Sequence, residues 1–296
     1  RPWLLLRKLE RAGMPAPRIA VVVASGPIVP WDEAEIAPGR IGARPLAATL
    51  RRVARDKRVA AVVLRVDAPG GSGMVSDLLW RDLRRLKDKK PLVVSMGSLA
   101  ASGGYYLAMA ADRVVATPPT LTGSIGVVAG KFDISGLMDK LGLKQEVLSY
   151  GRNTGIYSPT TGLTDAERER LQSFVEEFYE VFVGKAADCR GVGRDELEEH
   201  ARGRIWTGTQ ALARGLVDKT GGLDTALAEA AQLAQLGVTW DTCWVESPRP
   251  GLVARLQSLV PVVRTGLGVV EEAREDLLVS RPDLVQARLP VDLRFL

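Results

Sequence analysis

Residues 100–112 read Ala-Ala-Ser-Gly-Gly-Tyr-Tyr-Leu-Ala-Met-Ala-Ala-Asp, and residues 120–126 read Thr-Leu-Thr-Gly-Ser-Ile-Gly. The first stretch predicts a helix over residues 98–111, whose small side chains allow close packing on a sheet or a substrate. The second places Ser124 between glycines, which let the chain bend sharply and a substrate approach the backbone. This arrangement suits a nucleophile that faces an oxyanion hole.

A catalytic serine needs two kinds of neighbour. A base must take the hydroxyl proton, and backbone N–H groups must point at the oxyanion of the tetrahedral intermediate. One such N–H lies beside Ser124, and the pair Gly70-Gly71, which follows a strand-like run, offers another. The alternative is that residues 123–126 form only a tight turn into a strand over residues 125–128.

His200 is the sole histidine, so a Ser-His-Asp triad would have to use it. It belongs to residues 195–202, Asp-Glu-Leu-Glu-Glu-His-Ala-Arg, whose charged helical pattern predicts a solvated surface. A lysine is therefore the expected base, because Ser-Lys pairs are known variants of the triad.

Apolar runs alternate with helical patterns along the first half of the chain. Strands are predicted at residues 18–23, 59–66 and 91–95, and helices at residues 45–57 and 74–89. Strands that alternate with helices of this length indicate βαβ units and a parallel sheet, and hence an α/β fold.

The chain resembles the signal peptide peptidase A (SppA) family at several motifs. These are Arg-Val-Asp-Ala-Pro-Gly-Gly-Ser at 65–72, residues 95–106, Leu-Thr-Gly-Ser-Ile-Gly-Val at 121–127, and the shorter segments 203–208 and 213–218. The resemblance covers roughly residues 18–236. It implies a Clp-protease/crotonase-like α/β fold and a serine-lysine peptidase that degrades signal peptides left in the membrane after secretion.

The resemblance also assigns roles to residues. Ser124 matches the family nucleophile, and Gly71 and Ile125 match the positions whose N–H groups form the oxyanion hole. Further residues expected to contact the peptide substrate are Gly70, Ser72 and Gly123. No metal or other cofactor is expected.

The family lysine is missing from its expected place. In the short family form it lies in a Gly-x-x-Lys segment before a Ser-Pro, whereas residues 151–159 here read Gly-Arg-Asn-Thr-Gly-Ile-Tyr-Ser-Pro, with Thr154 at that position. The chain is similar to the C-terminal half of the long, tandem form, whose other half brings the lysine. The alternative is a catalytically silent scaffold.

Without this lysine, the chain by itself should be inactive. The chain begins at Arg1 and not at Met, as expected for a piece of a longer protein. Lys131 is the lysine nearest to Ser124 in the sequence, but it is expected to lie beyond a strand that leads away from the site. Partners are therefore a lysine-bearing homologous domain or subunit, with a homo-oligomer expected.

Three regions are predicted: a lead-in or linker at 1–17, a peptidase domain at 18–237 and a mostly helical extension at 238–296. Cys189 and Cys243 are too few for a zinc site and are expected as free thiols or one bridge. No run of eighteen apolar residues occurs in the chain. A membrane anchor would thus need a further segment.

The net charge of +5 is spread over mixed signs, and no nucleic-acid-binding motif accompanies it. The basic balance fits solubility with some attraction to anionic lipid. The resemblance implies the bacterial cell envelope, with the catalytic domain on the extracytoplasmic side, and leaves a cytoplasmic location open. A crotonase-type acyl-CoA enzyme is a further alternative, although such enzymes place acidic residues at the chemistry and residues 118–128 contain none.

Overall fold

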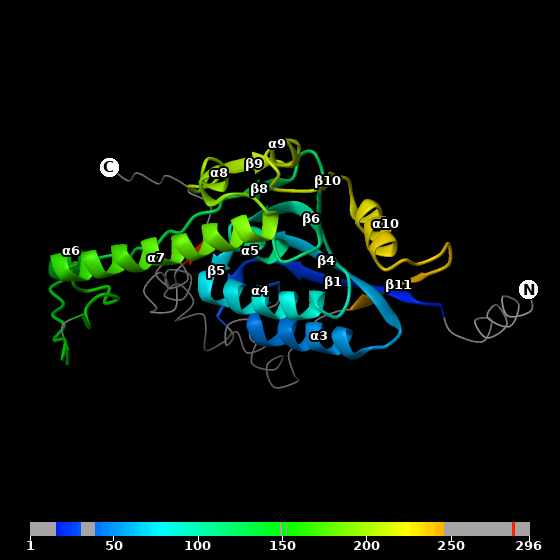
Figure 1. Ribbon diagram of the computed structural model, residues 1–296. Coiled ribbons are helices and arrows are strands. Elements are labelled where there is room, and N and C mark those ends of the chain that lie inside the picture. The colour runs from blue at the N-terminus through cyan, green and yellow to red at the C-terminus, as the bar shows by residue number, and fades with distance from the viewer. Residues whose placement is uncertain (1–15, 31–38, 149, 152, 246–285, 288–296) are drawn as a thin grey trace, which may run out of the picture.

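The computed structural model describes residues 16–30, 39–148, 150–151, 153–245 and 286–287. These residues form an α/β fold in which a parallel sheet lies between helices (Figure 1). The predicted fold class is therefore confirmed.

The main sheet is built from apolar, β-branched segments. Its neighbouring strands follow the order β10-β7-β6-β4-β1-β11, and every pair along this path is parallel. The strands are β1 (Arg18–Ser25), β4 (Val59–Ala68), β6 (Leu92–Ala101), β7 (Arg113–Ala116), β10 (Lys219–Thr220) and β11 (Asp241–Val245). Because β1, β4 and β6 are buried on both faces, they read as continuous apolar runs.

Alternate residues of each strand face opposite layers of helices. In β1, Ala20 and Val22 belong to the larger core, whereas Ile19 and Val21 belong to a smaller core on the other face. The larger core is covered by α3 (Ala43–Arg55), α4 (Gly73–Lys87), α5 (Gly103–Ala108) and the C-terminal part of α7 (Asp165–Arg190). The smaller core is covered by α10 (Leu223–Leu233).

A second, smaller sheet continues from the carboxyl end of β4. It has the order β12-β5-β2-β3, and its members are β2 (Ile28–Val29), β3 (Ile41–Gly42), β5 (Gly71–Ser72) and β12 (Gln286–Ala287). Strand β5 lies between β2, to which it is parallel, and β12, to which it is antiparallel. Residues 286–287 thus lie against the strand that begins at the second glycine of the Gly70-Gly71 pair.

Strand β6 changes partner along its length. Its first half pairs with β7, and its last three residues pair with β8 (Leu121–Gly123), which in turn pairs with β9 (Ile205–Thr207). The prediction of a helix over residues 98–111 was therefore wrong at its start. Residues 98–101 stay extended because they hydrogen-bond to β8, and the helix begins only at Gly103.

Helix α7 carries an arm that extends to the left in Figure 1, with α6 (Ser135–Lys140) at its far end. The helix begins at a capping box, in which the Thr164 hydroxyl accepts from the Glu167 N–H and the Glu167 carboxylate accepts from the Thr164 N–H. Helices α8 (Arg194–Glu198) and α9 (Gly208–Ala213) lie above α7 in the same view. Within the described ranges, none of the helices is long and apolar enough to cross a membrane.

The predicted extension over residues 238–296 is described only in part. Its first described residues include β11, which pairs with β1 at the edge of the main sheet, so this part is a strand and not a helix. Residues 246–285 and 288–296 lie outside the described residues, and the helical character predicted for them stays a prediction.

Candidate active site

Three connections meet beyond the carboxyl ends of β4, β6 and β8. The Ser102 N–H, at the end of β6, donates to the Gly123 carbonyl oxygen at 2.9 Å. A Cβ atom on Gly103 would lie 3.2 Å from Cα of Gly70, so α5 begins in contact with the glycine turn that follows β4. The fold therefore brings the glycine pair and the serine motif, which the sequence singled out separately, into one cluster.

Ser124 follows β8 directly and is fully buried. Its φ of +50° lies in the left-handed region, where a residue other than glycine is strained, and such strain is concentrated at functional sites. The strand precedes the serine, and residues 125–128 form no strand. The alternative of a turn into a strand over those residues therefore does not describe this segment.

The backbone beside Ser124 is held by the segment that leads into β9. The Ser124 N–H donates to the Arg204 carbonyl oxygen at 2.7 Å, and the Gly203 N–H donates to the Ile125 carbonyl oxygen at 2.9 Å. Among the described residues, no backbone carbonyl accepts from the Ile125 N–H. Of the two N–H groups at the serine, the one at Ser124 is therefore engaged, and the role of the Ile125 N–H in an oxyanion hole stays a prediction.

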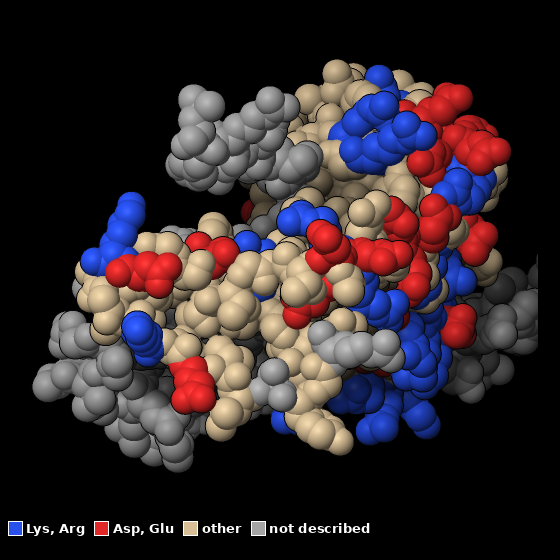
Figure 2. Space-filling view, turned by 90° about the vertical axis from the view of Figure 1, so that its left-hand side faces the viewer, with Lys and Arg blue, Asp and Glu red and all other residues tan. Residues whose placement is uncertain are grey.

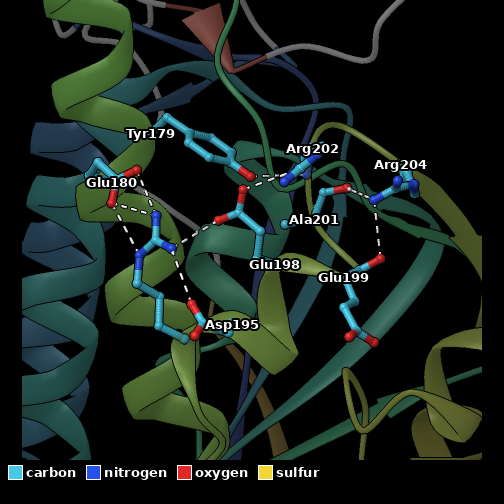
Figure 3. A network of polar contacts seen from close by, with 9 residues as sticks. Tyr179, Glu180, Asp195, Glu198, Glu199, Ala201, Arg202 and Arg204 are labelled. Carbon is cyan, nitrogen blue, oxygen red and sulfur yellow. Dashed lines mark hydrogen bonds and ion pairs between the residues drawn. The ribbon is translucent and has the colours of Figure 1, made fainter.

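A polar network fixes that segment from the side of α7 (Figure 3). Arg194 forms a bidentate pair with Glu180 at 2.6 and 2.5 Å and a second pair with Glu198 at 3.2 Å. Glu198 also pairs with Arg202 at 3.2 Å, and the Arg202 N–H donates to the Tyr179 hydroxyl at 3.2 Å. Burial raises the pKa of Tyr179, which stays a neutral partner here.

The same network reaches the residue that holds Ser124. The Arg204 guanidinium donates to the carbonyl oxygens of Glu199 and Ala201 at 3.1 and 3.4 Å, which closes the turn after α8 (Figure 3). The Arg204 carbonyl is thereby presented to the Ser124 N–H. These positioning residues carry no motif in the sequence beyond the clustering of charges over residues 194–204, and sequence reasoning missed them.

Gly71 has a backbone that only glycine adopts. Its φ is +139°, and a Cβ atom built on it would lie 2.0 Å from the Ile28 carbonyl oxygen in β2. Ser72 follows as the N-cap of α4 and accepts from the Val75 N–H at 3.4 Å. The close approach of β2 explains the second glycine of the pair, and the Ser72 hydroxyl is engaged in capping.

Ser102 is a further residue that the sequence reasoning did not single out. It stands at the sharp turn from β6 into α5 with φ +53°, and it is fully buried. Within the described part of the chain, its hydroxyl has no hydrogen-bond partner. The signal in the sequence was the Ser-Gly-Gly at 102–104, because a strand that turns directly into a helix needs small residues at the turn.

The lysine side chains that have identified partners contact parts of the structure other than the cluster around Ser124. Lys131 donates to the carbonyl oxygens of Gly155 and Gly162 at 2.9 and 3.4 Å, so it ties together two turns of the arm. The other four pairs are Lys87 with Asp112, Lys90 with the carbonyl of Val59, Lys185 with Asp77 and Lys219 with Glu229.

The sequence also singled out Thr154, at the family's lysine position, and His200, as the sole histidine. Thr154 is exposed on the arm, where its hydroxyl donates to the Gly151 carbonyl at 3.4 Å. His200 lies in the turn after α8, half-buried, with its ring edge-on to Trp206 at 6.3 Å between centroids. The expectation of a solvated histidine therefore holds in part, because His200 keeps some exposure while Trp206 lies beside it.

The described residues contain no group of three His, Cys, Asp or Glu side chains suited to a metal ion. Cys189 and Cys243 are both free thiols and both half-buried. The chemistry available at this cluster is therefore that of a strained serine with backbone N–H donors beside it.

The chain matches the sequence profile of peptidase family S49 over residues 84–237, which include Ser124. It is 38% identical to the chloroplastic serine protease SPPA of Arabidopsis thaliana, over 86% of this chain and 39% of that protein. It is 34% identical to protease 4 of Salmonella typhi, over 93% of this chain and 42% of that protein. The chain thus spans about two fifths of the length of these two relatives.

A shorter relative is matched over most of its length. A putative protease of Synechocystis is 34% identical, over 79% of this chain and 85% of that protein. Among solved structures, a ClpP1 mutant from Listeria monocytogenes aligns over 75% of this chain and 99% of that chain, with a TM-score of 0.47 and 14% identity.

Proposed function

Because the chain belongs to peptidase family S49, we propose that it is a serine endopeptidase whose nucleophile is Ser124. The observation that carries this proposal is the strained backbone of Ser124 at the meeting point of β4, β6 and β8, beside the Ile125 N–H. Relatives that are themselves described as proteases support the same reaction class.

The reaction follows the general course of acyl transfer. A neutral lysine amine takes the proton of the Ser124 hydroxyl while Oγ attacks the peptide carbonyl carbon. The Ile125 and Gly71 N–H groups bind the oxyanion of the tetrahedral intermediate. Its collapse breaks the C–N bond, and the lysine returns the proton to the leaving amine. Water, deprotonated by the same lysine, then hydrolyses the acyl-enzyme.

The lysine would come from a homologous domain or a second subunit. This assignment is supported by the exposed Thr154 at the family's lysine position and by the partners that hold five of the chain's own lysines. A general-base lysine must lose about three pKa units from its usual 10.4, which corresponds to ~4 kcal/mol and requires burial. An interface between two chains or halves supplies such burial.

The proposed substrates are extended apolar peptides, with cleaved signal peptides as the class that the family suggests. Support comes from β5, whose edge pairs antiparallel with residues 286–287 and so accepts an extended chain directly beside Gly71. The buried state of Ser124 means that neighbouring groups must move before a peptide carbonyl reaches its hydroxyl.

We further propose a homo-oligomer in the bacterial cell envelope, associated with the membrane through a segment outside this chain and active on the extracytoplasmic side. A silent scaffold is the second candidate, and it is favoured by the absence of lysine at position 154. An acyl-CoA enzyme finds less support, since such enzymes place acidic residues at the chemistry and residues 118–128 around Ser124 contain none.

The test is cleavage of a fluorogenic signal-peptide substrate. The chain is assayed alone and mixed with a lysine-bearing S49 chain, as the parent and as Ser124→Ala. We expect turnover only in the mixture, with a loss of at least ~10³-fold for Ser124→Ala. Equal turnover by parent and Ser124→Ala would refute Ser124 as nucleophile, and turnover by neither would favour the scaffold.

A further inference from the structure

Helices α3 and α4 lie side by side on the larger core (Figure 1). Residues of both helices line a groove. The groove has a volume of about 390 Å³. Its floor is apolar and consists of Ala43, Ala47, Leu78 and Leu79. It lies apart from the cluster around Ser124, since none of that cluster's residues lines it.

The walls of this groove are strongly basic. Arg44 and Arg51 line it from α3, and Arg81 and Arg85 line it from α4, with Asp82 as the one acidic residue. Asp82 is shared between Arg85 at 3.3 Å and Arg51 at 3.9 Å, so one carboxylate faces two guanidinium groups. Figure 2 shows Lys and Arg side chains gathered at the lower right of the viewed face, on the side where α3 and α4 lie in Figure 1.

An apolar floor between basic walls fits an amphipathic segment whose polar side is acidic. The chain itself contains one. Residues 268–279 read Gly-Val-Val-Glu-Glu-Ala-Arg-Glu-Asp-Leu-Leu-Val, with four acidic residues and one arginine. At helical spacing, Val269, Ala273 and Leu277 share one face, and Glu272 and Asp276 lie along one side of it.

The residues between this segment and β12 form a short tether that keeps the segment close to the groove. Residues 286–287 pair with β5, which is followed at once by α4. The seven steps from Val279 to Gln286 span at most about 24 Å when extended. Arg81 lies eight residues along α4 from Gly73, or about 12 Å of helix. The chain therefore reaches the groove without crossing the molecule.

We propose that the groove between α3 and α4 is the docking site for residues 268–279 of the same chain. The apolar face of the segment covers the groove floor, and Glu272 and Asp276 meet the arginines of the walls. A covalent tether of this length keeps the segment at a high local concentration, so modest contacts suffice. The proposal does not depend on the peptidase activity.

The test is hydrogen–deuterium exchange of the 296-residue chain, followed in peptides that cover residues 268–279. We expect protection of this segment in the parent, and a loss of at least about tenfold in Arg81→Glu/Arg85→Glu, because two attractive pairs become repulsive. Combining this variant with Glu272→Arg/Asp276→Arg should restore protection. The matched control is Arg168→Glu/Arg170→Glu, which changes the same charge on α7 and should leave the exchange of 268–279 unchanged.

Thermal unfolding of each variant shows whether the sheet core stays folded, so that a loss of protection reports on docking. Exchange that is fast in the parent, or that the groove variant leaves unchanged, overturns the proposal. Protection that rises with protein concentration would assign the groove to a second copy. The groove would be assigned to a lipid surface by one further result. In it, the parent sediments with phosphatidylglycerol vesicles, only the groove variant loses this binding, and residues 268–279 show no protection.

Discussion

The backbone N–H of Ser124 donates to the carbonyl oxygen of Arg204 at 2.7 Å, across 80 residues of sequence. This bond removes the serine's own N–H from the set of possible oxyanion donors and fixes the left-handed backbone of the residue. The neighbouring Ile125 N–H donates to no backbone carbonyl among the described residues, and it is the donor that we propose for the oxyanion. The turn after α8, which is held by Arg194, Glu198 and Arg202, is therefore part of what positions the candidate nucleophile.

Gly71→Ala should destabilise the protein strongly. The added Cβ would lie 2.0 Å from the Ile28 carbonyl oxygen, and the φ of +139° is open only to glycine. We expect a loss of about 2–4 kcal/mol in the free energy of unfolding, measured by urea denaturation. Gly184→Ala is the control, because Gly184 lies inside α7 with no atom of the described residues within 4 Å of its Cβ position, and it should gain up to about 1 kcal/mol. Equal stability of Gly71→Ala and the parent would contradict the described β2–β5 contact.

Asp218→Ala should also lower stability. Asp218 forms a bidentate pair with the largely buried Arg190 at 2.9 and 3.1 Å and accepts from the Val114 N–H at 2.7 Å. Its removal leaves a buried guanidinium and a backbone donor without their carboxylate, at a cost of about 3 kcal/mol. Asp195→Ala removes a fully exposed carboxylate and should change stability by less than about 0.5 kcal/mol. Equal free energies of unfolding for Asp218→Ala and Asp195→Ala would show that the contact with Arg190 contributes nothing to stability.

The start of α7 should weaken in acid. The Thr164 N–H donates to the Glu167 carboxylate and lowers its pKa below the usual value. A carboxylate with a lowered pKa stabilises the fold above its unfolded pKa of about 4.3, and this contribution is lost as the pH falls through the folded value. The margin in melting temperature of the parent over Glu167→Gln should therefore shrink between about pH 7 and about pH 3. Glu169→Gln, on the exposed side of the same helix, serves as control. A melting-temperature difference between the parent and Glu167→Gln that grows in acid would contradict a stabilising carboxylate at Glu167.

The chain alone should show no peptidase turnover, and Lys131→Ala should change nothing. Lys131 is held by the carbonyl oxygens of Gly155 and Gly162 in the arm, which occupies its ammonium group. The measurement is hydrolysis of a fluorogenic peptide by the parent and the variant. Robust turnover by the parent that disappears in Lys131→Ala would make this chain a self-sufficient Ser-Lys peptidase and would refute the shared site.

The sequence predicts the framework of the fold because periodicity reports burial. The runs 59–66 and 91–95 are apolar apart from Arg65 and Ser95, and they lie inside the sheet as expected. The stretch 98–101 was misassigned because small residues such as Ala100 and Ala101 are compatible with both a helix and a buried strand. Only the pairing with β8 decides between them, and β8 is distant in sequence.

The candidate site was predictable where chemistry leaves a local pattern. Glycines beside Ser124 and at 70–71 mark backbone that must turn or approach closely, and both are found in one cluster. No sequence pattern indicates the hydrogen bond between Ser124 and the Arg204 carbonyl, because a backbone carbonyl acts through its position alone. The half-buried state of His200 was missed for a similar reason, because Trp206 reaches it through the turn into β9.

Whether Ser124 is the nucleophile is tested by covalent labelling of the assembled peptidase with a serine-directed fluorophosphonate, followed by mass spectrometry of the modified peptide. The probe reacts only with a serine that a base has activated. We expect a single adduct on Ser124 that is absent from Ser124→Ala, while Ser102→Ala still carries it. An adduct on Ser102, or active peptidase that carries no adduct on Ser124, would contradict the assignment of Ser124 as the nucleophile.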